Sequence, residues 1–289
     1  MTERAPASSA RIVTRFAPSP TGYLHLGHAH SALHGWRAAR AGGGRFLLRI
    51  EDIDPGRCRP EFEAAITEDL RWLGLDWEAP PRRQSEHMAD YQGALERLDA
   101  AGLLYPCFCT RKSIRAEIER AGQAPHGPDG PLYPGTCRGL GADERRARIA
   151  GGRNYALRLD VAEAAARAGP LTWSDLGRGR IAADPLSLGD VVLARKDVAT
   201  SYHLAVTLDD ALQGVTLVIR GQDLFHASHM HRLLQALLEL PVPQWQHHDL
   251  IADAAGERLA KRSDAFSIRA LREAGKRPAE VRALAGFAD

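Results

Sequence analysis

The segment from Arg15 to His28, which reads RFAPSPTGYLHLGH, constrains the fold more than any other part of the chain. A strand-like stretch, residues 11–16, precedes it, and residues 29–40 have the composition of a helix. The segment therefore lies where a strand leads into a helix N-terminus. Such a junction concentrates backbone N–H groups and the positive end of the helix dipole, which favour a polyphosphate ligand.

Two glycines and two histidines occupy this junction. Gly22 and Gly27 allow the backbone to approach a ligand because neither has a Cβ. His25 and His28 can donate hydrogen bonds to phosphate oxygens as charge develops during a reaction. A P-loop has the same glycine spacing, but His28 and Ala29 stand where it requires Lys and Ser or Thr. A dinucleotide fingerprint is excluded because the pattern GxGxxG is absent here.

The whole segment resembles the HIGH signature of class I aminoacyl-tRNA synthetases, and its lead-in, residues 15–22, resembles the glutamyl branch in particular. The alternative is a glycine-rich turn with solvated histidines. The resemblance implies an α/β fold in which a Rossmann-like parallel sheet is split by a zinc-binding insertion. It also implies that ATP, bound with Mg²⁺, and L-glutamate are substrates, and that the glycines and histidines of the signature bind ATP.

The order of apolar and polar stretches along the chain agrees with this layout. Strands and helices alternate up to residue 104, which predicts a parallel sheet with right-handed crossovers. The next stretch is rich in Gly and Pro and carries three cysteines, so we expect an inserted subdomain. We then expect strands at residues 191–195, 202–207 and 216–219, a helix at 227–240, and a loop. The expected parts are a flexible tail (1–10), the two halves of the catalytic domain (11–104 and 189–255), the zinc-containing insertion (105–188) and a loop with a basic C-terminal segment (256–289).

Composition and charge exclude several classes of protein. The net charge of the 289 residues is only +2, and no apolar run is long enough to span a bilayer. The first ten residues lack the apolar core of a signal peptide, so we expect a cytoplasmic protein without membrane association. We also expect a monomer. From Arg258 to Asp289, eight Lys and Arg stand against four Asp and Glu. Such a basic end can follow a nucleic-acid backbone or form an ordinary solvated helix face.

Charged side chains follow the ends of several expected strands. Arg15 and Ser19 flank the end of the first strand, and Glu51 and Arg220 each close a later one. Ligands of open parallel sheets bind beyond the carboxyl ends of the strands, so we expect these groups to share one crevice. Two arginines and one carboxylate complement the two carboxylates and the ammonium of glutamate. The resemblance assigns the ammonium to Glu51, a substrate-contacting hydroxyl to Tyr202 and a carboxylate to Arg220. The alternative is a set of ordinary salt bridges and a packed tyrosine.

A second nucleotide-binding element lies near the end of the chain, where residues 258–262 read RLAKR. This stretch is similar to the KMSKS loop of the same family, whose last lysine steadies the triphosphate. Lys261 matches that lysine. Arg258 and Ala260 depart from the pattern, and the lost serine hydroxyl predicts a loop that closes less tightly. A surface Lys–Arg pair is the alternative.

Cys107, Cys109 and Cys137 are candidate metal ligands within the expected insertion. Thiolates favour zinc, and a structural zinc site is tetrahedral, so a fourth ligand is needed. The resemblance implies Tyr133 as this ligand, through a C-x-C…Y-x-x-x-C set. Twenty-three residues separate Cys109 from Tyr133, a long gap that makes His126 a rival ligand. Three structural thiols without a metal are the remaining alternative.

Only 28 residues follow Lys261, so we expect no anticodon-binding domain. The resemblance is to truncated paralogues of the glutamyl-tRNA synthetases, and it implies the following chemistry. Glutamate is activated by ATP without tRNA and is then esterified to the queuosine cyclopentenediol in the anticodon of tRNA(Asp), with His25, His28 and Lys261 stabilising charge on the phosphates. The alternatives are a catalytically weak tRNA-binding module, another adenylate-forming nucleotidyltransferase, and a short conventional glutamyl-tRNA synthetase.

Overall fold

The computed structural model describes residues 11–78, 80–110, 112–114, 116, 126–128, 130–195, 198–251 and 267–288. Its helices are α1 (Leu26–Ala41), α2 (Pro60–Trp72), α3 (Met88–Ala100), α5 (Ala142–Ala150), α6 (Val161–Ala168), α7 (Tyr202–Leu212), α8 (Ala227–Leu237), α9 (Ile268–Glu273) and α10 (Pro278–Leu284). Its strands are β1 (Val13–Phe16), β2 (Arg45–Ile50), β3 (Arg82–Arg83), β4 (Leu104–Cys107), β5 (His126–Gly127), β6 (Gly130–Pro131), β7 (Ala156–Leu159), β8 (Thr172–Asp175), β9 (Gly179–Ala182), β10 (Val192–Arg195), β11 (Leu217–Gly221) and β12 (Gln244–His248).

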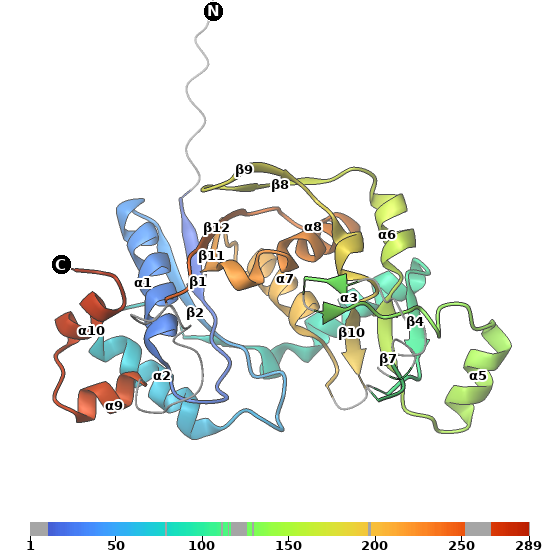
Figure 1. The fold of residues 1–289 in the computed structure, drawn as a ribbon, viewed down its shortest axis with the longest axis horizontal. Coiled ribbons are helices and arrows are strands. Elements are labelled where there is room, and N and C mark those ends of the chain that lie inside the picture. Colours follow the sequence, from blue (N-terminus) through green and yellow to red (C-terminus); the bar gives the residue numbers. More distant parts are fainter. Residues whose placement is uncertain are drawn as a thin grey trace, which may run out of the picture.

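The chain forms an elongated α/β structure. Helices α1, α2, α9 and α10 gather around β1 and β2 at one end, whereas β4, β7 and α5 lie toward the other (Figure 1). In the part of the chain that the structure describes, no helix has the length and apolar character needed to cross a bilayer.

The sheets are mixed rather than uniformly parallel. Strands β1, β2 and β3 form one parallel sheet, and β11, β12 and β8 form another, to which β9 adds an antiparallel edge. The two sheets adjoin where Thr216 Oγ1 accepts a hydrogen bond from Val13 N and Thr216 N donates to the Val13 carbonyl, at 2.9 and 3.0 Å. The predicted parallel pairing is thus confirmed for these strands, but β10, β7 and β4 pair antiparallel.

Two of the expected local structures are wrong. Residues 202–207, expected as a strand, form the first turns of α7, in which the Ser201 hydroxyl caps the helix by accepting from Leu204 N. A short apolar run fits a strand or a buried helix equally well, and Ser201 was the helix-start signal that the periodicity argument overlooked. The loop expected after α8 contains β12, which pairs with β11 in parallel. Strand β11 and helix α8 themselves confirm the expectations for residues 216–219 and 227–240.

The stretch 105–188 is tied by hydrogen bonds to both of its flanks. Strand β7, within it, pairs with β4 on one side and with β10 on the other. Strand β8 pairs with β12 through Trp245 and Asp175. The expected domain boundaries stay a prediction, but this stretch contributes β8 and β9 to the sheet that contains β11 and β12.

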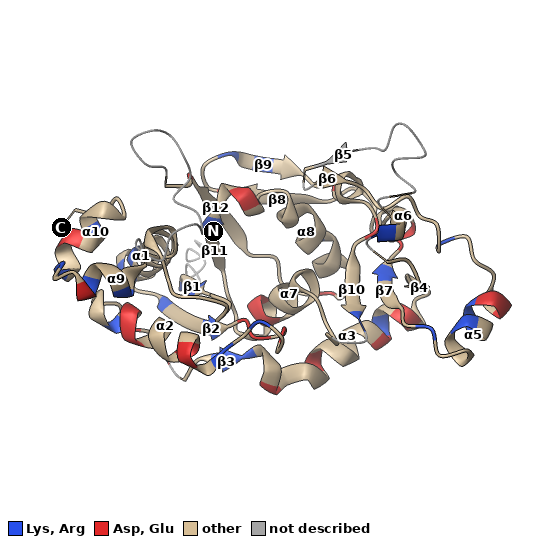
Figure 2. Cartoon of the chain, turned by 60° about the horizontal axis from the view of Figure 1, so that its bottom comes forward, with Lys and Arg blue, Asp and Glu red and all other residues tan. Residues whose placement is uncertain are grey.

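The described part of the basic C-terminal end pairs its cations with neighbouring carboxylates. Basic and acidic residues are interspersed on α9 and α10 (Figure 2). The ion pairs are Arg269–Glu273, Arg272–Glu68, Arg272–Asp69, Lys276–Glu280 and Arg277–Glu280. For residues 267–288, these contacts favour a solvated helix face over a nucleic-acid track.

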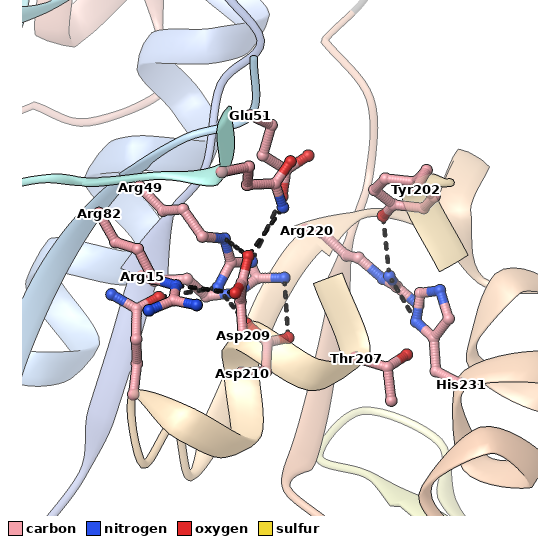
Figure 3. Close-up of polar contacts among 12 residues, drawn as sticks. Arg15, Arg49, Glu51, Arg82, Tyr202, Thr207, Asp209, Asp210, Arg220 and His231 are labelled. Carbon is pink, nitrogen blue, oxygen red and sulfur yellow. Dashed lines mark hydrogen bonds and ion pairs between the residues drawn. The ribbon is translucent and has the colours of Figure 1, made fainter. Parts of the chain in front are cut away.

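A buried ion cluster joins α7 to the first sheet (Figure 3). The fully buried Arg49 of β2 donates to Asp210 of α7 at 2.8 Å, and Arg15 of β1 donates to the same carboxylate at 3.0 and 3.3 Å. Burial alone would raise the pKa of Asp210, but the charges of Arg15 and Arg49 outweigh it and lower that pKa below its ordinary value. The Asp210 carboxylate therefore stays ionised and compensates two buried guanidinium groups.

Asp209, the residue before Asp210 in α7, likewise accepts hydrogen bonds from buried groups, in this case from β3, from Gln84 and from α3. Asp209, which is fully buried, accepts hydrogen bonds from Arg82 of β3 and Gln84, both at 2.8 Å. The hydroxyl of Tyr91 in α3 donates to the same carboxylate at 3.0 Å. Consecutive carboxylates on one helix thus fix its position against β1, β2, β3 and α3.

We predict that Asp210→Asn destabilises the fold strongly. The variant leaves the charges of Arg15 and Arg49 buried without their common counter-ion, and breaking such a pair costs about 3–5 kcal/mol. Urea unfolding measures the change in the free energy of unfolding. Arg40→Ala is the control, because it breaks the exposed pair with Asp76 and should change that free energy little. Equal effects of the two variants would contradict the prediction.

Candidate active site

A cavity of about 390 Å³ opens beyond the carboxyl ends of β1, β2 and β11, beside the N-terminus of α1. Its lining brings together most of the side chains that the sequence singled out, from four separate stretches of the chain. They are Arg15, His25, Gly27, His28, Glu51, Tyr202 and Arg220. The geometric expectation that strand-end charges share one crevice is therefore met.

Three predicted residues are not among those that line the cavity. Ser19 is exposed, and a Cβ on Gly22 would meet no protein atom within 4 Å, so the role of Gly22 in the approach of a ligand stays a prediction. At Gly27, by contrast, a Cβ would lie 3.0 Å from the His25 ring. Lys261 and the rest of the 258–262 motif lie outside the described residues.

The described residues on either side of that motif reach the cavity. Ile251 lines it. Ser267 forms an antiparallel bridge with His25, and Ile268 N donates to the Leu24 carbonyl at 2.8 Å. The two ends of the intervening stretch are thus held next to the signature segment. The role of Lys261 itself stays a prediction.

The signature histidines begin α1 and cap it. His25 Nδ1 accepts a hydrogen bond from Gly27 N, and His28 Nδ1 accepts one from His25 N, both at 3.1 Å. The two rings stack with their centroids 3.7 Å apart. Because each Nδ1 is an acceptor, the hydrogen of each neutral ring is on Nε2. The helix N-terminus therefore carries two imidazole rings at the cavity, a position that suits phosphate oxygens.

Arg220 is the most unusual group in the cavity wall, because it is buried and its hydrogen-bond partners are neutral. Its Nη1 donates to the Tyr202 hydroxyl at 3.2 Å and to His231 Nδ1 at 3.3 Å (Figure 3). Its Nη2 donates to Ser228 Oγ at 2.7 Å, and its Nε donates to His247 Nε2 at 3.2 Å. Among the described residues, no carboxylate lies within ion-pair distance of Arg220. A buried cation without a counter-ion is a site for an anionic ligand.

Arg15 is in the opposite situation, although it is equally buried. Its Nε and Nη2 are bound to Asp210, and its Nη1 donates to the Ile219 carbonyl at 3.4 Å. Its charge is therefore compensated within the protein. Of the two arginines predicted to bind carboxylates, Arg220 retains the greater capacity to do so.

Among the described residues, Glu51 is one of two acidic residues, with Asp223, that line the cavity. Its carboxylate accepts from Arg49 at 3.3 Å and is almost fully buried. Burial raises its pKa above the ordinary value, and the negative charges of Asp210 and Asp209 add to this effect, while Arg49 and Arg15 oppose it. A cationic ligand beside Glu51 would lower that pKa and favour the ionised form. The cavity thus pairs an uncompensated cation with a carboxylate that gains from a cationic partner.

A second cluster brings together the predicted metal ligands. The Sγ atoms of Cys107, Cys109 and Cys137 all lie within 4.8 Å of one another. The Tyr133 hydroxyl lies 3.3 Å from Cys107 Sγ and 3.7 Å from Cys109 Sγ. Three sulfurs and one phenol around a common centre fit the donor set that zinc prefers. The side chain of His126, the rival ligand, lies outside the described part of the chain.

Of the residues that hold Arg220, sequence reasoning singled out Tyr202 and missed Ser228, His231 and His247. Ser228 and His231 lie on α8, and His247 lies near the end of β12. The rule that found Arg220, a polar residue closing an apolar strand, does not extend to His247, because residues 244–248 read QWQHH and contain a single apolar residue.

Comparison with known proteins gives the same family on both sequence and fold. The family of class I tRNA synthetases (E and Q), catalytic domain, matches residues 11–285. A glutamyl-Q tRNA(Asp) synthetase of Rhodobacter capsulatus is 49% identical over 285 residues, which cover 96% of this chain and 100% of that protein. A glutamate–tRNA ligase of Citrifermentans bemidjiense is 41% identical, and the match covers 93% of this chain and 55% of the ligase. The crystal structure of a glutamate–tRNA synthetase from Elizabethkingia anophelis superposes with a TM-score of 0.74 at 30% identity, covering 92% of this chain and 54% of that one.

The histidines around Arg220 predict a pH-dependent stability. Burial first, and then the charge of Arg220, lowers the pKa of His203 and His247 to about 4, and the pKa of His231 also lies well below its usual value. Below pH 6.5 the unfolded chain binds more protons at these sites than the folded chain. The free energy of unfolding therefore loses up to about 1.4 kcal/mol per histidine for each pH unit between about 6.5 and 4.

Urea unfolding of the wild type and of His203→Gln at pH 7.5 and 5.0 measures how much of the free energy of unfolding is lost as the pH falls. The variant should show a smaller loss between the two pH values, since one depressed histidine is gone. Burial raises the pKa of Asp69 to about 6, so this carboxyl stabilises the fold as the pH falls, opposite to the histidines. The comparison of the two proteins cancels this contribution, because both contain Asp69. An identical pH dependence in both proteins would contradict the prediction.

Proposed function

The chain belongs to the class I tRNA synthetases (E and Q), a family of ligases, and we propose that it activates L-glutamate with ATP and transfers it to queuosine in tRNA(Asp). The observation that carries the proposal is the charge pattern of the cavity. Arg220 is a buried cation with neutral partners, and Glu51 is a buried carboxylate with a raised pKa. A free amino acid with an additional carboxylate complements this pair.

In the first step, Arg220 binds one carboxylate of glutamate, the Tyr202 hydroxyl contacts the substrate, and Glu51 receives its ammonium group. An oxygen of the α-carboxylate attacks the α-phosphorus of ATP, and the bond from that phosphorus to the pyrophosphate oxygen breaks. The products are glutamyl-adenylate and pyrophosphate. No covalent nucleophile of the protein is needed, since the residues act by orienting the reactants.

The phosphates lie at the N-terminus of α1, where His25 and His28 present their Nε2–H donors. The positive end of the helix dipole adds to this stabilisation. Lys261 is the further cation proposed for the triphosphate. Mg²⁺ that accompanies ATP would neutralise part of the phosphate charge.

In the second step, a hydroxyl of the queuosine cyclopentenediol attacks the carbonyl of the adenylate, and AMP leaves. The choice of this acceptor is supported by the similarity to a protein named glutamyl-Q tRNA(Asp) synthetase over that protein's whole length. The second candidate is a catalytically weak tRNA-binding module. The specific observation in its favour is the sequence RLAKR, in which Ala260 lacks the hydroxyl of the family pattern.

We further propose that Cys107, Cys109, Cys137 and Tyr133 hold a structural zinc ion. Burial, followed by hydrogen bonding to Cys107, raises the pKa of the Tyr133 hydroxyl, so only the charge of a bound cation would make this phenol a phenolate ligand. A zinc ion bound by four protein groups has no open position for substrate. Its contribution would be to fix the strand β4 against the segment that carries Tyr133 and Cys137.

The proposed activity predicts ATP–pyrophosphate exchange that depends on glutamate and needs no tRNA. Transfer of radiolabelled glutamate should require tRNA(Asp) that carries queuosine and should fail with unmodified tRNA(Asp) and with tRNA(Glu). Arg220→Ala should abolish glutamate activation, because a buried carboxylate without its donor costs about 2–5 kcal/mol. Glutamate attached to the 3′ end of tRNA(Glu) as the main product would indicate a conventional synthetase instead, and absence of exchange would indicate the binding module.

The zinc proposal predicts one zinc ion per chain in protein purified from zinc-replete medium. Cys107→Ser and Cys137→Ser should lose the metal and lower the melting temperature. Cys58→Ser is the matched control, since Cys58 is not part of the cluster, and it should retain the metal. Tyr133→Phe tests the fourth ligand. If elemental analysis finds no zinc in the wild type, the three cysteines are structural thiols without a metal.

A further inference from the structure

Arg220 is held by a buried chain of side chains that extends away from the cavity. His247 Nε2 accepts from Arg220 Nε at 3.2 Å, and His247 Nδ1 lies 2.7 Å from Asp175 Oδ2. The side chains of His247 and Asp175 are 0% and 1% exposed. His247 is not among the residues that line the cavity, so it reaches a ligand only through Arg220.

The donors of this chain fix the protonation state of His247. The Nε of an arginine can only donate, so His247 Nε2 must be the acceptor. An ionised Asp175 can only accept, so the hydrogen of the imidazole is on Nδ1. Ser228 agrees with this tautomer, because its hydroxyl accepts from Arg220 Nη2 at 2.7 Å and lies 3.3 Å from His247 Nε2. His247 is therefore a neutral link between a buried carboxylate and a buried guanidinium.

We propose that Asp175 and His247 are positioning residues for the amino-acid substrate, which hold the Arg220 guanidinium in place while leaving its charge for the substrate carboxylate. This inference rests on the proposed function. The Asp175 carboxylate lies one imidazole away from Arg220, so it stabilises the buried cation without occupying the cation's binding face. The burial that lowers the pKa of His247 keeps the link neutral at physiological pH.

The contrast with Arg15 shows why the imidazole matters. Asp210 binds Arg15 directly through two hydrogen bonds, and a carboxylate in that position competes with any anionic ligand. At Arg220 the imidazole replaces the direct contact. The Asp175 carboxylate is itself fixed, because its Oδ1 accepts from Gly177 N and Arg178 N at 2.9 and 3.1 Å.

Two substitutions of His247 distinguish its contact with Arg220 from its contact with Asp175. In His247→Asn, the side-chain amide replaces the Nδ1 end, so it can still donate to Asp175 but does not reach Arg220. In His247→Gln, the longer amide can place its oxygen where Nε2 was and accept from Arg220. Glutamate-dependent ATP–pyrophosphate exchange gives KM for glutamate, KM for ATP and kcat for each protein.

We expect His247→Asn to raise KM for glutamate at least about tenfold, because a hydrogen bond to a charged group is lost, with KM for ATP unchanged. His247→Gln should recover a large part of this loss. The matched control is His229→Asn, since His229 is a buried histidine that also packs on Trp173 and Phe225 but does not contact Arg220. It should leave all three parameters unchanged.

An unchanged KM for glutamate in His247→Asn, equal rises in both KM values, or equal effects of Asn and Gln would each overturn the proposal. Asp175→Asn provides a second, nearly isosteric variant if His247→Asn does not fold. Its amide nitrogen would favour the other imidazole tautomer, so the same rise in KM for glutamate is expected, and an unchanged KM would overturn the proposal. Failure of the wild type to activate glutamate would instead count against the proposed function.

Discussion

The fold depends on how it neutralises charge in its interior. Consecutive carboxylates at the C-terminal part of α7, Asp209 and Asp210, compensate arginines that come from β1, β2 and β3. A buried guanidinium is costly to desolvate and is stable only with such a partner. The same contacts orient α7 so that Tyr202, at its first turn, reaches the cavity. The geometry of the site is therefore set in part by buried ion pairs that join residues of the cavity wall, Arg15 and Glu51, to partners behind it.

The buried arginines differ in whether their hydrogen-bond partners are charged or neutral. Arg49 and Arg15 are bound directly by carboxylates, which compensate their charges within the protein. Arg220 is bound by a tyrosine, a serine and two histidines, and it keeps its charge for a ligand. Imidazoles suit this position because burial keeps them neutral while leaving an acceptor nitrogen. The choice of hydrogen-bond partner thus decides whether the charge of a buried arginine is already compensated within the protein.

Sequence patterns predicted the parts of the site that follow local rules. The glycine and histidine spacing located the start of α1, and the positions of Arg15, Glu51 and Arg220 at strand ends placed them in one cavity. The same reasoning misassigned residues 202–207, because short apolar runs do not distinguish a strand from a buried helix. It overlooked β12 because its sequence, QWQHH, contains only one apolar residue. Contacts such as Arg49–Asp210, 161 residues apart, and Asp175–His247, 72 apart, carry no local pattern at all. They become visible only once the strands are paired.

The pairing of β8 with β12 has a consequence for how such chains can be recombined. Asp175 belongs to the stretch expected to be an insertion, yet its carboxylate supports an arginine at the catalytic cavity. The stretch 105–188 is therefore not an independent module that can be exchanged between relatives at will. A chimaera that replaced it would also replace one end of the hydrogen-bonded chain behind Arg220. Compatibility at a single buried carboxylate would then decide whether the hybrid still recognises its amino acid.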